Sequence, residues 1–166
     1  SGLGGGIIIN GKLFQGSHFQ AGELTFLLPL QMEKLDPSLM QGTTLSAIGL
    51  ITKVNEILAR LDLKDGLLAF KAINAKKEAV YPIFETYCRN LAITILNLQT
   101  IFDMETFVLG GGISAQSILI EEVNRQFDKV HHEIDFIGKI IKRPKIVACH
   151  HNGTNLIGAA YFLKQG

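Results

Sequence analysis

Short runs of strand-forming residues, separated by Gly and polar residues, open this chain, a pattern typical of strands joined by a tight turn. Three Ile residues at 7–9 are followed by Asn10-Gly11, and Lys12–Gln15 come next. Asn-Gly is the dipeptide favoured in two-residue type I′ turns. The pattern therefore predicts a β-hairpin. The following residues, 17–42, are expected to form loops, with one short extended or helical piece ending at Pro29.

Farther along, apolar residues recur every three or four positions, which is the spacing of amphipathic helices. This spacing predicts a helix over 43–63 capped by Thr43 or Thr44, a shorter helix over 65–77 and a long helix over 78–102. The long helix has an apolar stripe made of Val80, Ile83, Phe84, Tyr87, Leu91, Ile95 and Leu98.

The second half alternates strand and helix patterns. A buried strand is expected at Thr106–Leu109, a helix over 114–134 capped by Ser114, a strand within 144–150, and a closing helix within 152–165. Strands alternating with helices predict an α/β fold, with a mixed sheet covered by helices. No Pro-rich or Ser-rich linker interrupts residues 1–166, so a single domain is expected.

Composition and charge exclude several classes of protein. The 166 residues are 47% hydrophobic and carry a formal net charge of +1, which argues against a basic nucleic-acid-binding surface. Cys88 and Cys149 form no C-x-x-C pair, and both are expected to be free thiols in a reducing compartment. The sequence shows no stretch of about 18 apolar residues and no basic leader, so a cytoplasmic protein without membrane contact is expected.

Three glycine-containing segments are candidates for an anion site: "GLGGG" at 2–6, "LGGGIS" at 109–114 and "NGTNLIGAA" at 152–160. A strand that runs into glycine and then a helix leaves backbone N–H groups free to bind phosphate. A tight turn is the simpler explanation for each segment taken alone. The segments match neither the P-loop nor the dinucleotide fingerprint, and no Lys follows them, so amides and a metal ion would have to hold the phosphates.

These segments also carry a resemblance. "GLGGGIIINGKLFQGSHFQAGEL", "FVLGGGIS" and "NLIGAAYF" resemble, in order and spacing, the C-terminal lobe of the ROK family of sugar kinases and sugar-responsive repressors. The resemblance implies an actin-like, hexokinase-like (ribonuclease H-like) ATPase lobe with a helical insertion. It also implies that ATP lies between two lobes and that the general-base Asp belongs to the N-terminal lobe, so no catalytic residue is assigned here.

The resemblance implies which residues bind ligands. ATP with Mg²⁺ would be bound in part by Gly2, Gly4, Gly5, Gly110, Gly111, Gly112, Asn155 and Gly158. Glu23 would contact sugar hydroxyls, and His18 is a further candidate for the sugar site. Ser1 stands where the family has a hydroxyl residue in its first phosphate segment, and it is either native or a residue left by expression.

The sequence departs from the family at the zinc site. Phe26 stands where the family's zinc- and sugar-binding His would be, and residues 29–42 contain no Cys. Zinc favours Cys and His ligands in a tetrahedral set, so no zinc is expected. The chain therefore resembles the zinc-free branch that includes β-glucoside kinases. The other His residues, at His131-His132 and His150-His151, are weak metal candidates, and no metal site is predicted.

Three functions remain open from the sequence. The first is a fragment of an ATP-dependent sugar kinase, inactive alone, which contributes nucleotide-phosphate contacts and part of the sugar site. The alternative is the sugar-sensing lobe of a transcriptional repressor, which binds sugar without turnover; nucleic acid is a partner only if a helix-turn-helix precedes it. The third is a lobe that retains only dimer-forming packing. A homodimer and a sugar or glycoside ligand are the expected partners.

Overall fold

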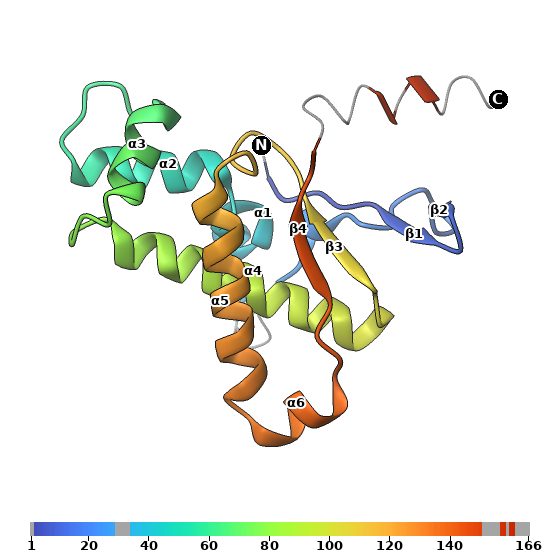
Figure 1. The fold of residues 1–166 in the computed structure, drawn as a ribbon. Helices are drawn as coiled ribbons and strands as arrows, with labels where there is room; N and C mark the ends of the chain where they lie inside the picture. Colours follow the sequence, from blue (N-terminus) through green and yellow to red (C-terminus); the bar gives the residue numbers. More distant parts are fainter. Residues whose placement is uncertain (1, 29–33, 151–156, 159, 162–166) are drawn as a thin grey trace. The chain divides into compact units, whose positions relative to one another are not determined.

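A computed structural model describes residues 2–28, 34–150, 157–158 and 160–161. The chain divides into two compact units, Ser1–Tyr87 and Cys88–Gly166. Each unit is described by itself below (Figure 1). The single-domain organisation expected from the sequence stays a prediction.

The first unit opens with the predicted β-hairpin. Strands β1 (Ile7–Ile9) and β2 (Lys12–Phe14) pair antiparallel, with Ile8 opposite Leu13. The two turn residues Asn10 and Gly11 have φ of 52° and 74°. Two consecutive positive φ values define a type I′ turn, so this prediction is confirmed.

After the hairpin come two single-turn 3₁₀ helices, η1 (Leu24–Phe26) and η2 (Pro37–Leu39), and then α1 (Gln41–Thr44) and α2 (Ala47–Ile57). The single helix predicted over 43–63 is therefore wrong at its start. The Ser46 side chain accepts a hydrogen bond from the Gly49 amide at 3.1 Å and caps α2. The Thr44 hydroxyl instead donates back to the Met40 carbonyl within the preceding turn.

Helices α3 (Gly66–Asn74) and α4 (Tyr81–Phe102) follow the predicted ranges closely, and α4 continues from the first unit into the second. The rings of Phe70 and Phe84 meet edge to face in the core, with centroids 6.2 Å apart. Buried Asn55 donates to the carbonyls of Leu63 and Asp65, which ties the loop before α3 to α2. Such hydrogen bonds offset the free-energy cost of removing a polar side chain from water, so Asn55 can lie in the core.

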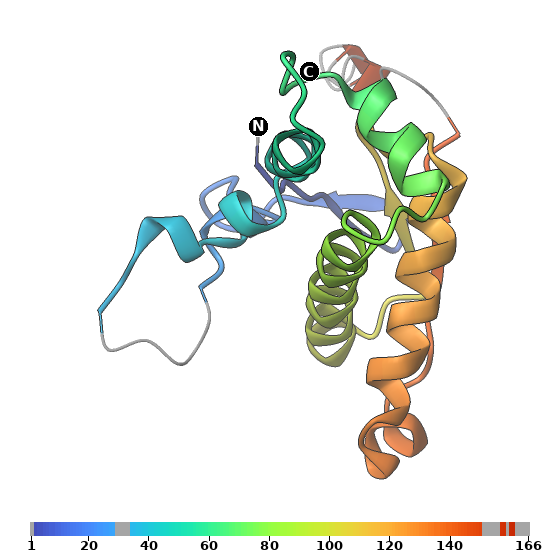
Figure 2. The same ribbon diagram turned by 90° about the vertical axis from the view of Figure 1, so that its left-hand side faces the viewer.

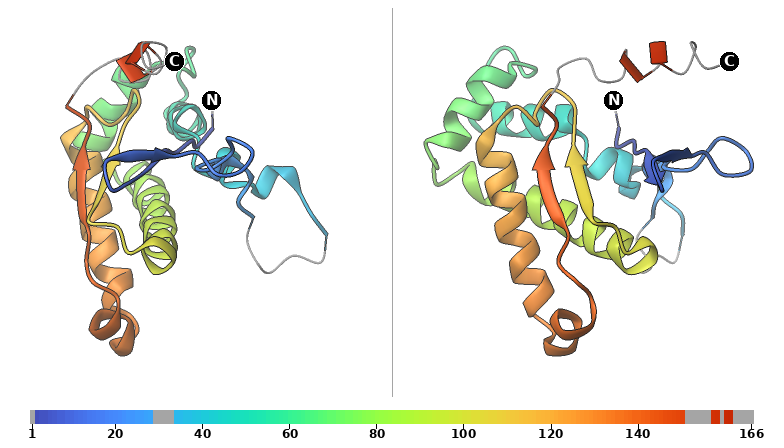
Figure 3. Two further views of the ribbon diagram at one scale, coloured as in Figure 1. Left: turned by 90° about the vertical axis from the view of Figure 1, so that its right-hand side faces the viewer. Right: turned by 45° about the vertical axis from the view of Figure 1, so that its right-hand side comes forward.

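The second unit is built on two parallel strands. Strands β3 (Thr106–Leu109) and β4 (Lys145–Ala148) pair so that Leu109 lies opposite Ala148, and α5 (Ser117–His132) and α6 (Asp135–Ile140) connect them. Figures 2 and 3 show α5 running alongside the strands. The strand predicted at Thr106–Leu109 is confirmed, but it is not buried: exposure alternates along it, and Val108 is 59% exposed.

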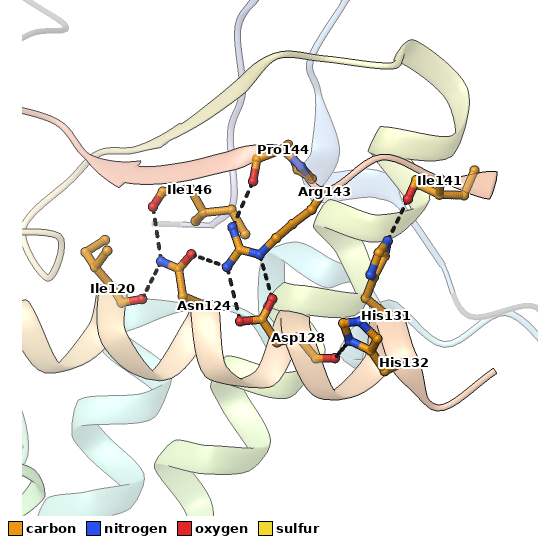
Figure 4. A network of polar contacts seen from close by, with 9 residues as sticks. All are labelled: Ile120, Asn124, Asp128, His131, His132, Ile141, Arg143, Pro144 and Ile146. Atoms are coloured by element: carbon orange, nitrogen blue, oxygen red, sulfur yellow. Dashed lines mark hydrogen bonds and ion pairs between the residues drawn. The ribbon is translucent and has the colours of Figure 1, made fainter. Parts of the chain in front are cut away.

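A polar network fastens the start of β4 to α5 (Figure 4). The Asn124 amide donates to the Ile120 and Ile146 carbonyls at 2.8 and 3.1 Å, and its oxygen accepts from Arg143 at 2.9 Å. Arg143 also donates to the Asp128 carboxylate at 2.6 Å. A guanidinium held by a carboxylate and an amide has little rotational freedom. The network therefore sets the position of β4 along α5.

Candidate functional site

The N-terminal glycine segment packs against the loop that carries Glu23, within the first unit. Gly22 has φ of +92°, and a side chain on it would run into the Gly5 carbonyl. The Thr25 hydroxyl donates to the Leu3 carbonyl at 2.8 Å. The structure thus brings together two segments that the sequence analysis assigned separately, one to phosphate and one to sugar.

The three predicted glycines of this segment differ in their surroundings. A Cβ on Gly2 would lie 3.2 Å from the Gly42 Cα, and a Cβ on Gly5 would lie 3.1 Å from the Leu24 Cδ1. A Cβ on Gly4 would meet nothing within 4 Å. A side chain on Gly2 or Gly5 would therefore crowd its neighbours, whereas of these three glycines Gly4 has open space beside its backbone.

Glu23 is exposed at the position that precedes η1 and forms no side-chain cap bond there. His18 is also exposed, in a loop closed by the Ala21 amide donating to the Gln15 carbonyl at 3.2 Å. No ion pair joins His18 to Glu23 among the described residues. The structure therefore leaves both side chains exposed to solvent without an ion pair between them.

The second glycine segment begins where β3 ends, in the second unit. The Cys149 amide donates to the Leu109 carbonyl at 2.8 Å and extends the ladder by one residue. A Cβ on Gly110 would lie 3.9 Å from the Cys149 Cβ, so the carboxyl ends of the two strands stay side by side. Gly111 has φ of +93°, and nothing lies within 4 Å of a Cβ built on Gly111 or Gly112.

Ser114 does not cap the following helix, contrary to the prediction. Its amide and its hydroxyl both donate to the Gly111 carbonyl, at 3.1 and 2.8 Å. The positive φ at Gly111 folds the chain back on itself, and this turn uses the Ser114 side chain. Helix α5 begins only at Ser117, with Gln116 before it and no side-chain cap bond.

This second segment has the chemistry of an anion site. Backbone without Cβ atoms leaves room for a ligand, and the first amides of a helix lack partners within the helix. Ligands of open α/β sheets bind beyond the carboxyl ends of the strands. Open space therefore lies beside the backbone of Gly111 and Gly112, at the end of the strands where such sheets commonly bind ligands.

The remaining predicted site residues lie in a helix, in exposed positions or outside the described part of the chain. Gly158 is helical and exposed, while Ser1, His151 and Asn155 lie outside the described residues. Within the described part of the chain, no group of three or more His, Cys, Asp or Glu side chains could hold a metal ion. Cys88 is buried and Cys149 partly buried, and neither forms a disulfide bond within the described part of the chain. No helix among the described residues is long and apolar enough to cross a bilayer.

Sequence reasoning missed the packing role of Gly42. A Cβ there would approach the Thr25 methyl group at 2.5 Å, so Gly42 lets Thr25 reach the N-terminal segment. A lone glycine at the start of a helix gives no local signal of such a contact, because its partner lies 17 residues earlier in the chain.

Comparison with known proteins relates this chain to one family. The sequence profile of the ROK family matches residues 1–166. A β-glucoside kinase from Listeria monocytogenes is 27% identical over 99% of this chain and 54% of its own length. An N-acetyl-D-glucosamine kinase from Vibrio cholerae is 29% identical over 98% of this chain and 56% of its own. The chain thus spans about half the length of the curated relatives it matches.

Solved structures of ROK family proteins are similar to this chain over nearly its whole length. A ROK family protein from Streptococcus pneumoniae, in complex with sucrose, has a TM-score of 0.78 and 26% identity, over 99% of this chain and 57% of that one. A ROK family glucokinase from Streptomyces griseus, in complex with glucose and AMPPNP, has a TM-score of 0.77 and 22% identity, over 100% and 58%. The actin-like, hexokinase-like fold class expected from the sequence is confirmed.

Proposed function

This chain belongs to the ROK family, and from that premise we propose that it is the lobe of an ATP-dependent sugar kinase that binds nucleotide phosphate and part of the sugar. The relatives that match nearly the whole chain are kinases of β-glucosides and of N-acetyl-D-glucosamine. That kinship favours a kinase over a repressor, the alternative left open by the sequence.

The observation that carries the nucleotide part is the uncovered backbone at Gly111 and Gly112. Neither position has an atom within 4 Å of where a side chain would begin. Gly110, Gly4 and Gly158 are proposed to contribute further backbone contacts, together with Gly2, Gly5 and Asn155. Bound ATP with Mg²⁺ would supply the phosphoryl group, and Mg²⁺ commonly binds through substrate phosphates and a few carboxylates.

The sugar part of the proposal depends on Glu23. An exposed carboxylate can accept hydrogen bonds from two neighbouring hydroxyls, and charge-assisted bonds are the stronger kind. The contacts of Gly22 and Thr25 anchor the backbone on both sides of Glu23, and a fixed backbone limits where its carboxylate can reach. The base that accepts the hydroxyl proton is proposed to lie in a second lobe outside this chain, and no zinc is proposed.

The test uses the complete protein, in which we propose that a second lobe accompanies this chain. ADP release is measured with ATP and each of phenyl β-glucoside, cellobiose, glucose and N-acetylglucosamine. Release that depends on one of these sugars is the expected result. Saturable sugar binding without ADP release, or no calorimetric signal with AMPPNP, would contradict the kinase and favour the repressor. The 166-residue chain alone is expected to give background release only.

A further inference from the structure

Helix α5 packs against β4 through apolar side chains and through a few directional bonds. The apolar residues Val123, Phe127 and Ile146 are buried. Burial of apolar surface has no preferred direction, so it does not by itself prevent a helix from sliding along a strand. Hydrogen bonds depend on distance and angle, and they therefore fix the register between two elements. Figure 4 shows the bonds that join α5 to β4 and to the residues before it.

Asn124 of α5 bonds directly to the backbone of β4. Its amide donates to the Ile146 carbonyl at 3.1 Å and to the Ile120 carbonyl of its own helix at 2.8 Å. On the other side of the strand, the Lys145 amide donates to the Glu105 carbonyl at 3.0 Å. Because successive residues of a strand face opposite edges, the Ile146 carbonyl faces the edge of β4 that lies away from β3. Asn124 therefore satisfies a backbone group that the ladder with β3 leaves unpaired.

Arg143, which lies just before β4, fixes the orientation of that amide. Its guanidinium donates to the Asn124 oxygen at 2.9 Å and to the two Asp128 carboxylate oxygens at 2.6 and 3.3 Å. A guanidinium can only donate and a backbone carbonyl can only accept, so one orientation of the Asn124 amide fits both partners. Residues four positions apart share one face of a helix. The network therefore holds two successive turns of α5 at Asn124 and Asp128.

The register of α5 also determines where the second glycine segment lies. Strand β3 ends at Leu109 and α5 begins at Ser117, so residues 110–116 must span from the end of the strand to the start of the helix. Asn124 follows Ser117 by about 10 Å along the helix axis, at about 1.5 Å per residue. A shift of α5 along β4 would therefore move the end of the glycine segment that joins the helix.

We propose that Asn124 and Arg143 are positioning residues, which set the register of α5 against β4 and thereby place Gly111 and Gly112 for nucleotide phosphate. This inference rests on the proposed function, because residues 110–112 are the proposed phosphate segment. It adds two side chains that act on nucleotide affinity through α5 rather than by contact with the nucleotide.

The test compares Asn124→Leu, Arg143→Gln and Arg143→Lys in the complete protein. Calorimetry measures the affinity for AMPPNP and, separately, for each of phenyl β-glucoside, cellobiose, glucose and N-acetylglucosamine. Asn124→Leu keeps the approximate size of the side chain and removes its bonds. It is expected to weaken AMPPNP binding roughly tenfold, since a misplacement of about 1 Å can cost about a hundredfold. Sugar affinity is expected to stay within about twofold.

The two Arg143 variants separate charge from geometry. Arg143→Gln removes the ion pair with Asp128 and is expected to weaken AMPPNP binding as Asn124→Leu does. Arg143→Lys keeps the charge but lacks the planar fork that reaches Asn124 and Asp128 together, so it is expected to restore the affinity only in part.

The matched control is Arg89→Gln, which breaks another ion pair of the second unit. The side chains of Arg89 and Glu133 are 37% and 50% exposed, close to the 39% and 48% of Arg143 and Asp128. That pair joins α4 to the residue after α5 and makes no contact with β4 in these bonds. Arg89→Gln is therefore expected to leave AMPPNP affinity within about twofold.

Hydrogen exchange without any ligand gives a second readout. Peptides covering 109–117 are expected to exchange faster in Asn124→Leu and Arg143→Gln than in wild type or Arg89→Gln. Unchanged AMPPNP affinity in both network variants, or an equal loss in Arg89→Gln, would overturn the inference, as would equal losses for AMPPNP and sugar. Wild-type protein that binds no AMPPNP would instead overturn the proposed function, and hydrogen exchange would still decide whether the network positions the segment. Arg143→Lys decides the matter should Asn124→Leu unfold.

Discussion

The hydroxyl of Thr25 donates a hydrogen bond of 2.8 Å to the carbonyl oxygen of Leu3. These residues are 22 positions apart, and the bond joins the glycine-rich start of the chain to the turn that presents Glu23. In the proposed kinase, one of these segments contacts phosphate and the other contacts sugar. A shift of either segment would therefore be transmitted to the other through backbone contacts.

Replacing Gly22 by Ala is expected to destabilise the first unit. The φ of +92° alone disfavours any residue with a Cβ by about 1–3 kcal/mol, and that Cβ would also collide with the Gly5 carbonyl. Urea unfolding measures the loss, and hydrogen exchange of peptides covering 2–27 locates it.

Gly6→Ala is the control for that substitution, because a Cβ on Gly6 meets nothing within 4 Å and its φ is not positive. It is expected to change the free energy of unfolding by less than about 0.5 kcal/mol. Equal losses from Gly22→Ala and Gly6→Ala would show that the contact with Gly5 is unimportant.

Glu23→Gln in the complete protein is expected to impair sugar use and to leave ATP affinity nearly unchanged. An amide keeps the shape of the carboxylate but accepts at one end only. Losing a hydrogen bond to a charged group costs roughly 1.5–3 kcal/mol, which is about 10-fold to 150-fold in kcat/KM for sugar. Glu56→Gln, at an exposed position on α2, serves as the control. Sugar kinetics within twofold of the wild type would make Glu23 an ordinary surface residue.

Gly111→Val is expected to weaken ATP binding more than sugar binding. Two effects contribute, because Val strains a backbone at φ of +93° and fills the space proposed for phosphate. Gly112→Val separates them, since Gly112 has the same open space without a positive φ. Calorimetric titration of AMPPNP and of sugar checks both variants. If Gly112→Val binds AMPPNP normally, the open space at that residue is not used by the nucleotide.

Stability of the second unit is expected to fall in acid through one ion pair. Arg89 and Glu133 form two hydrogen bonds of 2.7 Å, and the bond from Arg89 holds the pKa of Glu133 below its ordinary value of 4.5. A carboxylate with a lowered folded-state pKa stabilises the fold above its unfolded-state pKa. That contribution disappears as pH falls through the folded-state pKa.

Arg89→Gln should therefore lower Tm near neutral pH and lose its effect in strong acid, where Glu133 is protonated in both states. The effect is expected to be small, because both side chains are partly exposed and salt screens them. Thermal unfolding across pH measures it, with Arg60→Gln on the first unit as the control. A difference in Tm between Arg89→Gln and wild type that is the same at all pH values would exclude the ion pair as its cause.

Local signals predicted the local structure well. Asn10-Gly11 specifies its turn because both residues tolerate positive φ, and strand Thr106–Leu109 is bounded by the glycines that follow it. The first residues of the helices were harder to predict from the sequence. Thr44, Ser46 and Ser114 are equally good caps by residue type, and only the path of the preceding turn decides which hydroxyl meets a free amide.

Contacts between segments far apart in the chain could not be predicted from local sequence patterns. Nothing near Gly110 indicates that Cys149 will lie beside it, because the parallel pairing of β3 with β4 brings them together across α5. The packing of Gly5 against Gly22 is equally invisible to local patterns. Glycine clusters therefore identified the segments of the candidate site, but which glycines serve packing and which face open space came from the structure.

The contacts among Gly5, Gly22, Leu3 and Thr25 have a consequence for recombining this lobe with those of its relatives. A crossover in the hairpin at Asn10-Gly11 would take the segment before the turn from one parent and the segment after it from another. The contacts between the two segments would then be lost in the recombinant protein. A crossover after Gly42 would transfer these residues, together with the Gly42 against which Thr25 packs, from one parent. Shuffled libraries should therefore recover functional progeny mainly from the second kind of junction.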